Sequence, residues 1–137
     1  MTEIKNYTFE KCKSITSVTL PSGLTQIGDM AFSGCSALRS IVIPTGVTKI
    51  GEYAFSRCEL LTEVVIPQNV TFIGQGAFFE CSNLTNVIFE VADGWYYSNF
   101  NTIEGGKPFS VSDIADPQKA AMYIKGKYYT YHWIREQ

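Results

Sequence analysis

Four cysteines stand 23 residues apart in this chain, at Cys12, Cys35, Cys58 and Cys81. The same interval links the phenylalanines Phe9, Phe32, Phe55 and Phe78, the isoleucines Ile4, Ile27, Ile50 and Ile73, and the prolines Pro21, Pro44 and Pro67. An internal period of this length is the signature of a solenoid, because each unit is too small to bury its apolar side chains alone and must stack on its neighbours. The repeat therefore restricts the possible folds more than any other feature of the sequence.

One repeat, LRSIVIP followed by TGVTKIGEYAFSRC, indicates how each unit folds. Leu38, Ile41 and Ile43 are spaced as in a short strand with one buried face, and the proline that follows ends the strand because it donates no ladder hydrogen bond. A second brief extended stretch with Ile50 buried is expected before a bend at Gly51. The EYAFSRC segment is then expected to form one helical turn. Units stacked without reversal pair their strands in parallel.

The run L-x-x-I-x-I-P followed by I-G-x-x-A-F-x-x-C, at residues 15–32, 38–55 and 61–78, closely resembles the leucine-rich repeat of BspA-like bacterial surface proteins. The resemblance implies a leucine-rich repeat solenoid of the α/β horseshoe type, with a parallel β-sheet on its concave face and short helical turns on its convex side. It also implies a cell-surface or secreted location and binding to host, matrix or other cell-surface proteins. No catalytic residues come with the family. The first unit departs from the pattern, with Lys5 and Thr8 where the later units have Gly and Ala.

Residues 1–90 are interpreted as about four leucine-rich repeats, the first of them partial, and residues 91–137 as a C-terminal cap. The period stops after Phe89, and an aromatic-rich wrap is what the last unit of a solenoid needs to cover its core. Asp116 and Pro117 suit the start of a helix and Gly126 its end, which predicts a helix near 117–125. Alternating residues predict a terminal strand near 127–134. This tail also resembles the segment that closes some BspA-like arrays.

Charge and hydropathy exclude several classes of partner. The formal net charge is -2 and no cluster of Lys and Arg stands out, so nucleic acid is not an expected ligand. No apolar run approaches the roughly 18 residues that a membrane span needs. The first residues lack the apolar core of a signal peptide. We therefore expect no membrane insertion, and the surface or secreted location rests on the family resemblance alone.

The cysteines are expected to be buried free thiols. Equivalent side chains of stacked units point the same way rather than toward each other, which disfavours disulfides, although some bridging stays an alternative. Four collinear ligands cannot form a tetrahedral metal site. The sequence therefore predicts no metal and no cofactor.

Catalytic readings of other residues are also weak. His132 is the single histidine and lies between Tyr131 and Trp133, with no partner indicated by the pattern, so a structural or exposed role is expected. Glu59 and Glu63 resemble an acid/base pair, but the preceding unit has serine at both positions and the next unit has Ser82 and Asn86. The GQGAF stretch lacks the lysine of a phosphate-binding loop. The sequence predicts that the chain is not an enzyme.

The outward positions of the strands are the better candidate for a binding site. They form two rows, the polar Ser17, Ser40, Glu63 and Asn86 and the more apolar Thr19, Val42, Val65 and Ile88. Exposed apolar stripes with polar borders mark contact surfaces, although strands also favour β-branched residues for their own sake. Arg39 and Glu63 would lie at the border as candidate specificity groups.

Two functions fit this pattern. The first is non-enzymatic protein–protein interaction or adhesion through the concave face, in the C-terminal part of a bacterial cell-surface or secreted protein. The alternative is a purely structural terminal segment of a longer solenoid, with no ligand of its own. The first unit leaves Ile4, Phe9 and Ile15 without a cover, which favours the structural reading or self-association through the open N-terminal end.

Overall fold

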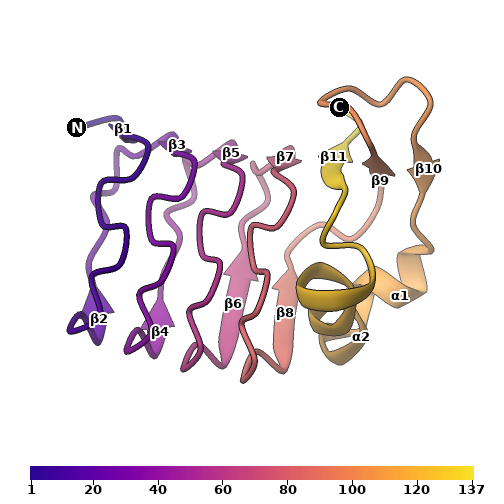
Figure 1. The fold of residues 1–137 in the computed structure, drawn as a ribbon. Helices are drawn as coiled ribbons and strands as arrows, with labels where there is room; N and C mark the ends of the chain where they lie inside the picture. Colours follow the sequence, from indigo (N-terminus) through magenta and orange to yellow (C-terminus); the bar gives the residue numbers. More distant parts are fainter.

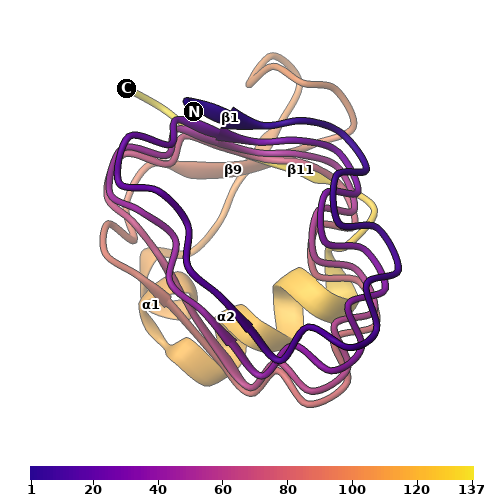
Figure 2. The same cartoon turned by 90° about the vertical axis from the view of Figure 1, so that its left-hand side faces the viewer.

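The repeats wind into consecutive coils that stack along one axis, with the C-terminal residues at one end of the stack (Figure 1). A computed structural model describes residues 1–137. Viewed along the axis, the coils superimpose on one closed outline, and helices lie behind them at the far end (Figure 2). The arrangement confirms the predicted leucine-rich repeat solenoid with mostly parallel strands.

One strand of each coil comes from the LRSIVIP segment. These strands are β2 (Ser17–Val18), β4 (Ser40–Ile41), β6 (Glu63–Ile66) and β8 (Asn86–Phe89), which we call the β2–β8 row. They pair in parallel as β2 with β4 and β6 with β8. The sequence predicts one continuous sheet here, whereas the structure has two separate pairs. The amides of Arg39 and Thr85 each bond the preceding coil at 3.0 Å, but no corresponding amide joins the second coil to the third.

The second extended stretch of each coil builds a longer sheet than the first. It consists of β1 (Glu3–Ile4), β3 (Gln26–Ile27), β5 (Lys49–Ile50) and β7 (Phe72–Ile73), all parallel. Strands from the C-terminal residues extend it, giving the order β1-β3-β5-β7-β11-β9-β10. These are β9 (Trp95–Ser98), β10 (Lys107–Pro108) and β11 (His132–Arg135), and β11 pairs antiparallel with both β7 and β9.

The segment between the two strand rows consists of tight turns instead of the predicted helical turn. Met30 and Tyr53 have positive φ angles of 54° and 52°, which a right-handed helix does not allow. The amide of Ala31 bonds the carbonyl of Gly28 within its own turn at 3.3 Å, whereas the amide of Phe32 bonds Ala54 in the next coil at 2.7 Å. Every second amide of the turn thus bonds the next coil and holds the two coils together. In a helix, these amides would instead bond carbonyls of the same helix.

The core is a set of columns that run through the stack. The rings of Phe9, Phe32, Phe55 and Phe78 stack with centroids 5.2, 5.3 and 5.3 Å apart. The leucines and isoleucines of both strand rows fill the rest of the interior, in one cluster that also contains Trp95 and Trp133. Because each column continues from coil to coil, no unit has a core of its own.

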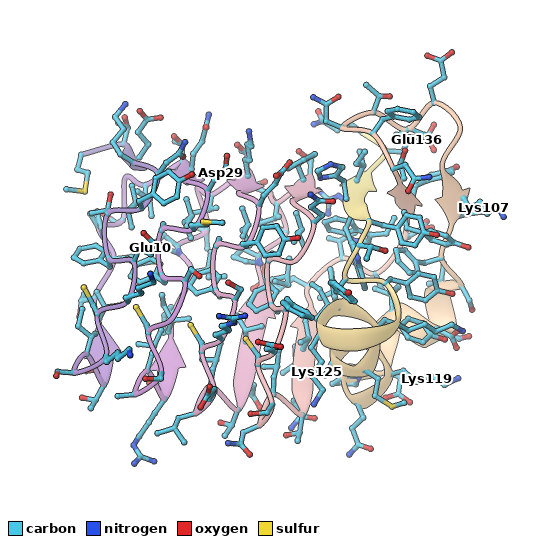
Figure 3. All side chains as sticks on the ribbon, in the orientation of Figure 1. Glu10, Asp29, Lys107, Lys119, Lys125 and Glu136 are labelled. Carbon is cyan, nitrogen blue, oxygen red and sulfur yellow. The ribbon has the colours of Figure 1, made fainter.

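Residues 91–137, which we call the C-terminal segment, pack against the last coil. They contain α1 (Val111–Ala115), α2 (Pro117–Met122) and a π-helical turn, η1 (Tyr123–Lys127). The Asp116 side chain caps α2 by accepting hydrogen bonds from the amides of Gln118 and Lys119 at 3.0 and 3.2 Å. Lys125, labelled in Figure 3, donates to the carbonyl of Leu84 at 2.7 Å. No helix of the structure is both long and apolar enough to cross a membrane.

Candidate functional site

The predicted binding residues lie on the outer side of the β2–β8 row. Alternation along the strands buries Ile41, Val64 and Ile66 and turns the intervening side chains outward. Val42 is 80% exposed, and Val65 and Ile88 are each 37% exposed. Val65 lies directly opposite Ile88 in the β6–β8 ladder. The structure therefore brings these two side chains together, and Val42 occupies the equivalent position of the preceding coil.

The polar residues form the border that the sequence predicts. Ser17 lies opposite Ser40, and Glu63 lies opposite Asn86. Ser17, Thr19, Arg39, Ser40 and Glu63 are exposed, and Asn86 is half-buried. No ion pair joins Arg39 to Glu63.

A shallow apolar groove adds to this surface between the first two coils. It has a volume of about 320 Å³ and is lined by Val18, Leu20 and Val42, with polar and proline side chains around them. Leu20 occupies the position of Ile43 and Ile66, which are buried, but it is only half-buried itself. Sequence reasoning missed Leu20 because the repeat assigns its position to the interior.

The structure indicates why cysteine recurs once in every repeat. Cys35, Cys58 and Cys81 are buried and free, and Cys12 is half-buried. The thiols of Cys35, Cys58 and Cys81 donate to the carbonyls of Phe9, Phe32 and Phe55 in the preceding coil at 3.2, 3.3 and 3.0 Å. Burial raises the pKa of Cys35 to about 12, so this thiol is a poor nucleophile at neutral pH. The cysteine column is thus a link between coils as well as a filler of space.

His132 joins the repeats to the C-terminal segment. Its Nδ1 accepts a hydrogen bond from the amide of Gln75 at 3.2 Å, and its ring stacks on Phe72 with centroids 5.3 Å apart. Its Nε2 lies 3.8 Å from a carboxylate oxygen of Glu52. Burial lowers the pKa of His132 despite this carboxylate. The geometry gives the histidine a structural role at the β7–β11 junction, and no nucleophile accompanies it.

We expect the chain to lose stability as the pH falls below the ordinary histidine pKa of 6.5. The folded pKa is the lower one, so the unfolded chain takes up the proton first and the free energy of unfolding declines with falling pH. Denaturant titrations between pH 7.5 and about pH 5 would measure this slope. His132→Asn keeps an acceptor for the Gln75 amide and should flatten the curve. An equally steep curve in that variant would contradict the assignment.

The glutamates singled out as a possible acid/base pair do not form a cleft. Glu59 and Glu63 are both exposed, and the backbone carbonyl of Glu59 is bound by the Asn83 side chain at 2.7 Å. No group of three or more His, Cys, Asp or Glu side chains is placed to hold a metal ion. The exposed face of the β2–β8 row is therefore the site that the geometry supports best.

Comparison with known proteins supports the assignment of the chain as a leucine-rich repeat solenoid. A family model described as BspA type leucine rich repeat region matches residues 1–105 in six copies. The chain is 36% identical to a T. pallidum leucine rich repeat protein, with a TM-score of 0.63, over 64% of this chain and 41% of that one. It is 36% identical to a leucine rich cell surface protein from Faecalibacterium prausnitzii, with a TM-score of 0.62, over 73% of this chain and 25% of that one.

A leucine-rich repeat protein from Bacteroides capillosus is similar as well, with 31% identity and a TM-score of 0.60 over 66% of this chain and 64% of that one. The chain spans less than two thirds of the length of each of these three proteins. No curated protein gives a significant match. With the stacked coils and the match over most of its length, the chain belongs to the BspA-type leucine-rich repeat family.

Proposed function

We propose that the chain is a non-enzymatic protein-interaction or adhesion module that binds its partner on the β2–β8 row. The observation that carries this proposal is the exposure of Val42, Val65 and Ile88, which occupy the same position in successive coils. Isolated exposed apolar residues are ordinary, but an aligned row bordered by polar side chains is typical of a contact surface. Arg39 and Glu63 stand at its border without an ion-pair partner and would select the orientation of the bound protein.

The setting we propose is the surface of a bacterial cell or the secreted fraction, with this chain as the C-terminal part of a larger protein. One similar protein, from Faecalibacterium prausnitzii, is described as a cell surface protein. The C-terminal segment would act as the cap of the array. In support of this, β11 pairs antiparallel with β7, and α2 buries Ala120 and Ala121.

A second candidate is a purely structural role as the end of a solenoid. It is favoured by the aromatic cluster of the C-terminal segment, in which Tyr97, Phe109, Tyr128 and Trp133 pack together. This cluster packs against the core at the C-terminal end of the stack and would complete it there. In this case the exposed valines would reflect only the strand preference for β-branched residues.

Self-association through the open N-terminal end is a third property that we propose.

The test of the first proposal is a double substitution, Val42→Asp with Val65→Asp. Two carboxylates in the apolar row should weaken binding to a responsive matrix glycoprotein or cell surface by at least about tenfold, since central apolar contacts dominate interface energies. Surface plasmon resonance against a panel of matrix glycoproteins, followed by binding to intact cells, would measure the change. Circular dichroism would first establish that the variant is folded.

The matched control is Val91→Asp with Val111→Asp. These valines are 37% and 48% exposed and lie in the C-terminal segment, so they test the same chemistry away from the row. Binding that survives in the control and is lost in the first variant supports the interaction face. Equal binding by both variants, or no binding by the unaltered chain to any member of the panel, would favour the structural role.

A further inference from the structure

The outer face of the long sheet carries side chains that differ from coil to coil. Gln26, Lys49 and Phe72 are the outward residues of β3, β5 and β7, and each lies opposite the next in the ladder. The isoleucine that follows each of them is buried. The buried residues are thus identical in these coils, whereas the outward residues are an amide, an ammonium group and an aromatic ring.

A shallow cavity of about 430 Å³ lies over these three residues. It is also lined by two carboxyl residues, two hydroxyl residues and a second amide, which are Asp29, Glu52, Thr48, Thr71 and Asn101. Phe72 is the single apolar residue of the lining. The volume is in the range of small-molecule sites, although such sites are usually lined by apolar residues. A ligand of this cavity would therefore be held mainly by hydrogen bonds.

The C-terminal segment contributes to the cavity as well as the repeats. The loop between β9 and β10, residues 99–106, rises above the long sheet (Figures 1 and 2). Its Asn101 is exposed and lines the cavity, while the rest of the lining comes from the repeats. Loops held on a rigid scaffold are common sources of ligand contacts. The cavity therefore exists at one place in the stack and is not repeated in every coil.

The charged groups of the lining have few partners within the chain. Lys49 forms no ion pair, and its Nζ lies 5.4 Å from the centre of the Phe72 ring. Asp29, labelled in Figure 3, uses only its Oδ1 within the chain, accepting the amide of Glu52 at 2.8 Å. The Glu52 carboxylate lies 3.8 Å from Nε2 of His132. Both a donor and acceptors are thus available to a ligand.

The chemistry of the lining selects among classes of ligand. Two carboxylates and one ammonium group give it a negative net charge, which disfavours phosphates, nucleotides and other anions. Protein partners bury aromatic and aliphatic anchors, and only Phe72 is there to receive them. An uncharged ligand rich in hydroxyl groups fits best, because each hydroxyl both donates and accepts hydrogen bonds.

The polar surface continues beyond this cavity. Thr48 and Thr71 also line a second cavity, of about 580 Å³, together with Gly46, Asn69 and Arg135 among others. No apolar side chain lines this second cavity. Because the two cavities share residues, a chain of linked sugars would contact more of the surface than a single sugar would.

We propose that this surface of the long sheet is a second binding site and that it takes an uncharged oligosaccharide. Lys49 and Asn101 donate to sugar hydroxyls, and the carboxylates of Asp29 and Glu52 accept from them. The long sheet and the β2–β8 row are separate strand rows of each coil (Figure 1). The site is therefore independent of the protein partner proposed above.

The test is an array of defined oligosaccharides probed with the full chain, followed by isothermal titration calorimetry of the members that respond. An uncharged member should bind with one ligand per chain. The sulfated form of the same oligosaccharide should bind at least about tenfold more weakly, because its charge repels the two carboxylates.

Two substitutions examine the residues of the site. Lys49→Met keeps the alkyl part of the side chain but removes its charged donor, and it should weaken binding by about tenfold or more. Asn101→Ala removes the amide of the loop and should weaken binding by about threefold to tenfold. Both residues are exposed, so neither substitution is expected to prevent folding, and circular dichroism would verify this.

Lys107→Met is the matched control. Lys107 is exposed in β10 at the far edge of the same sheet and projects away from the molecule (Figure 3). Its substitution should leave oligosaccharide binding unchanged, and so should the double substitution of Val42 and Val65 described above.

Amide NMR spectra of the complex would locate the ligand, with shifts expected at Thr48, Lys49 and Phe72. Shifts confined to the β2–β8 row would overturn the proposed site, and so would equal binding by the Lys49→Met variant and the unaltered chain. No response to any member of the array would overturn the proposal as a whole. Stronger binding of the sulfated form would overturn the assignment to an uncharged ligand.

Discussion

Phe55→Ala should destabilise the chain by about 3–5 kcal/mol, the usual cost of removing a fully buried phenylalanine. Phe55 is 0% exposed and stacks between Phe32 and Phe78, so its loss leaves a cavity in the middle of the column. The rings on either side belong to neighbouring coils, which cannot close the gap without shortening the distance between coils. Urea denaturation followed by circular dichroism would measure the change in the free energy of unfolding.

Phe100→Ala provides the matched control. Phe100 is 68% exposed in the C-terminal segment, so the same truncation should change stability by no more than about 0.5 kcal/mol. If the two variants were equally stable, the stacked phenylalanines could not be the main column of the core. Unfolding of the Phe55→Ala variant that was confined to the first two coils would likewise argue against cooperative stacking.

Gly51→Ala should destabilise the chain by about 1–3 kcal/mol or more, although it adds only one methyl group. The new Cβ would lie 2.6 Å from the backbone nitrogen of Asp29 and 2.6 Å from the carbonyl carbon of Gly28. Asp29 Oδ1 lies as close, but because the other two obstructing atoms are backbone, a side-chain rotation cannot relieve the clash. The coils would have to separate, which would stretch the 2.8 Å bond from the Gly51 amide to Ile27. Thermal and urea denaturation would measure the loss.

Gly126→Ala is the control for this substitution. Apart from its chain neighbours and the backbone of its own helical turn, no atom lies within 4 Å of a Cβ placed on Gly126, and its φ angle is not in the left-handed region. Alanine there should be neutral or stabilise the chain by up to about 1 kcal/mol, because it reduces the conformational freedom of the unfolded state. A large loss at Gly126, or none at Gly51, would contradict the account of close packing between coils.

The repeat made most of the solenoid predictable from the sequence. Residues at one position of the inner units share a similar environment, so the period alone assigned Leu38, Ile41 and Ile43 to the interior and Val42 to the surface. It also identified Lys5 as an exception to the glycine found at this position in later units. The reason could be seen only in the structure, because the close approach of the preceding coil explains why those units require glycine.

Three features could not be predicted because local patterns do not encode them. The turns depend on positive φ angles at Met30 and Tyr53, and neither residue type signals that conformation. The cysteine hydrogen bonds depend on which carbonyl of the preceding coil lies in reach. The pairing of β11 with β7 joins residues far apart in sequence, and the C-terminal segment has no second copy in the chain with which to compare it.

The hydrogen-bonded stacking of equivalent coils also bears on how such proteins evolve. Each inner coil offers its two neighbours the same amides, carbonyls and side chains, so gain or loss of one complete coil would recreate an interface that already exists. An insertion of a single residue would instead shift every later column out of alignment. Recombination between repeats, in steps of 23 residues, can therefore change the length of the solenoid while the side chains that form its core stay the same.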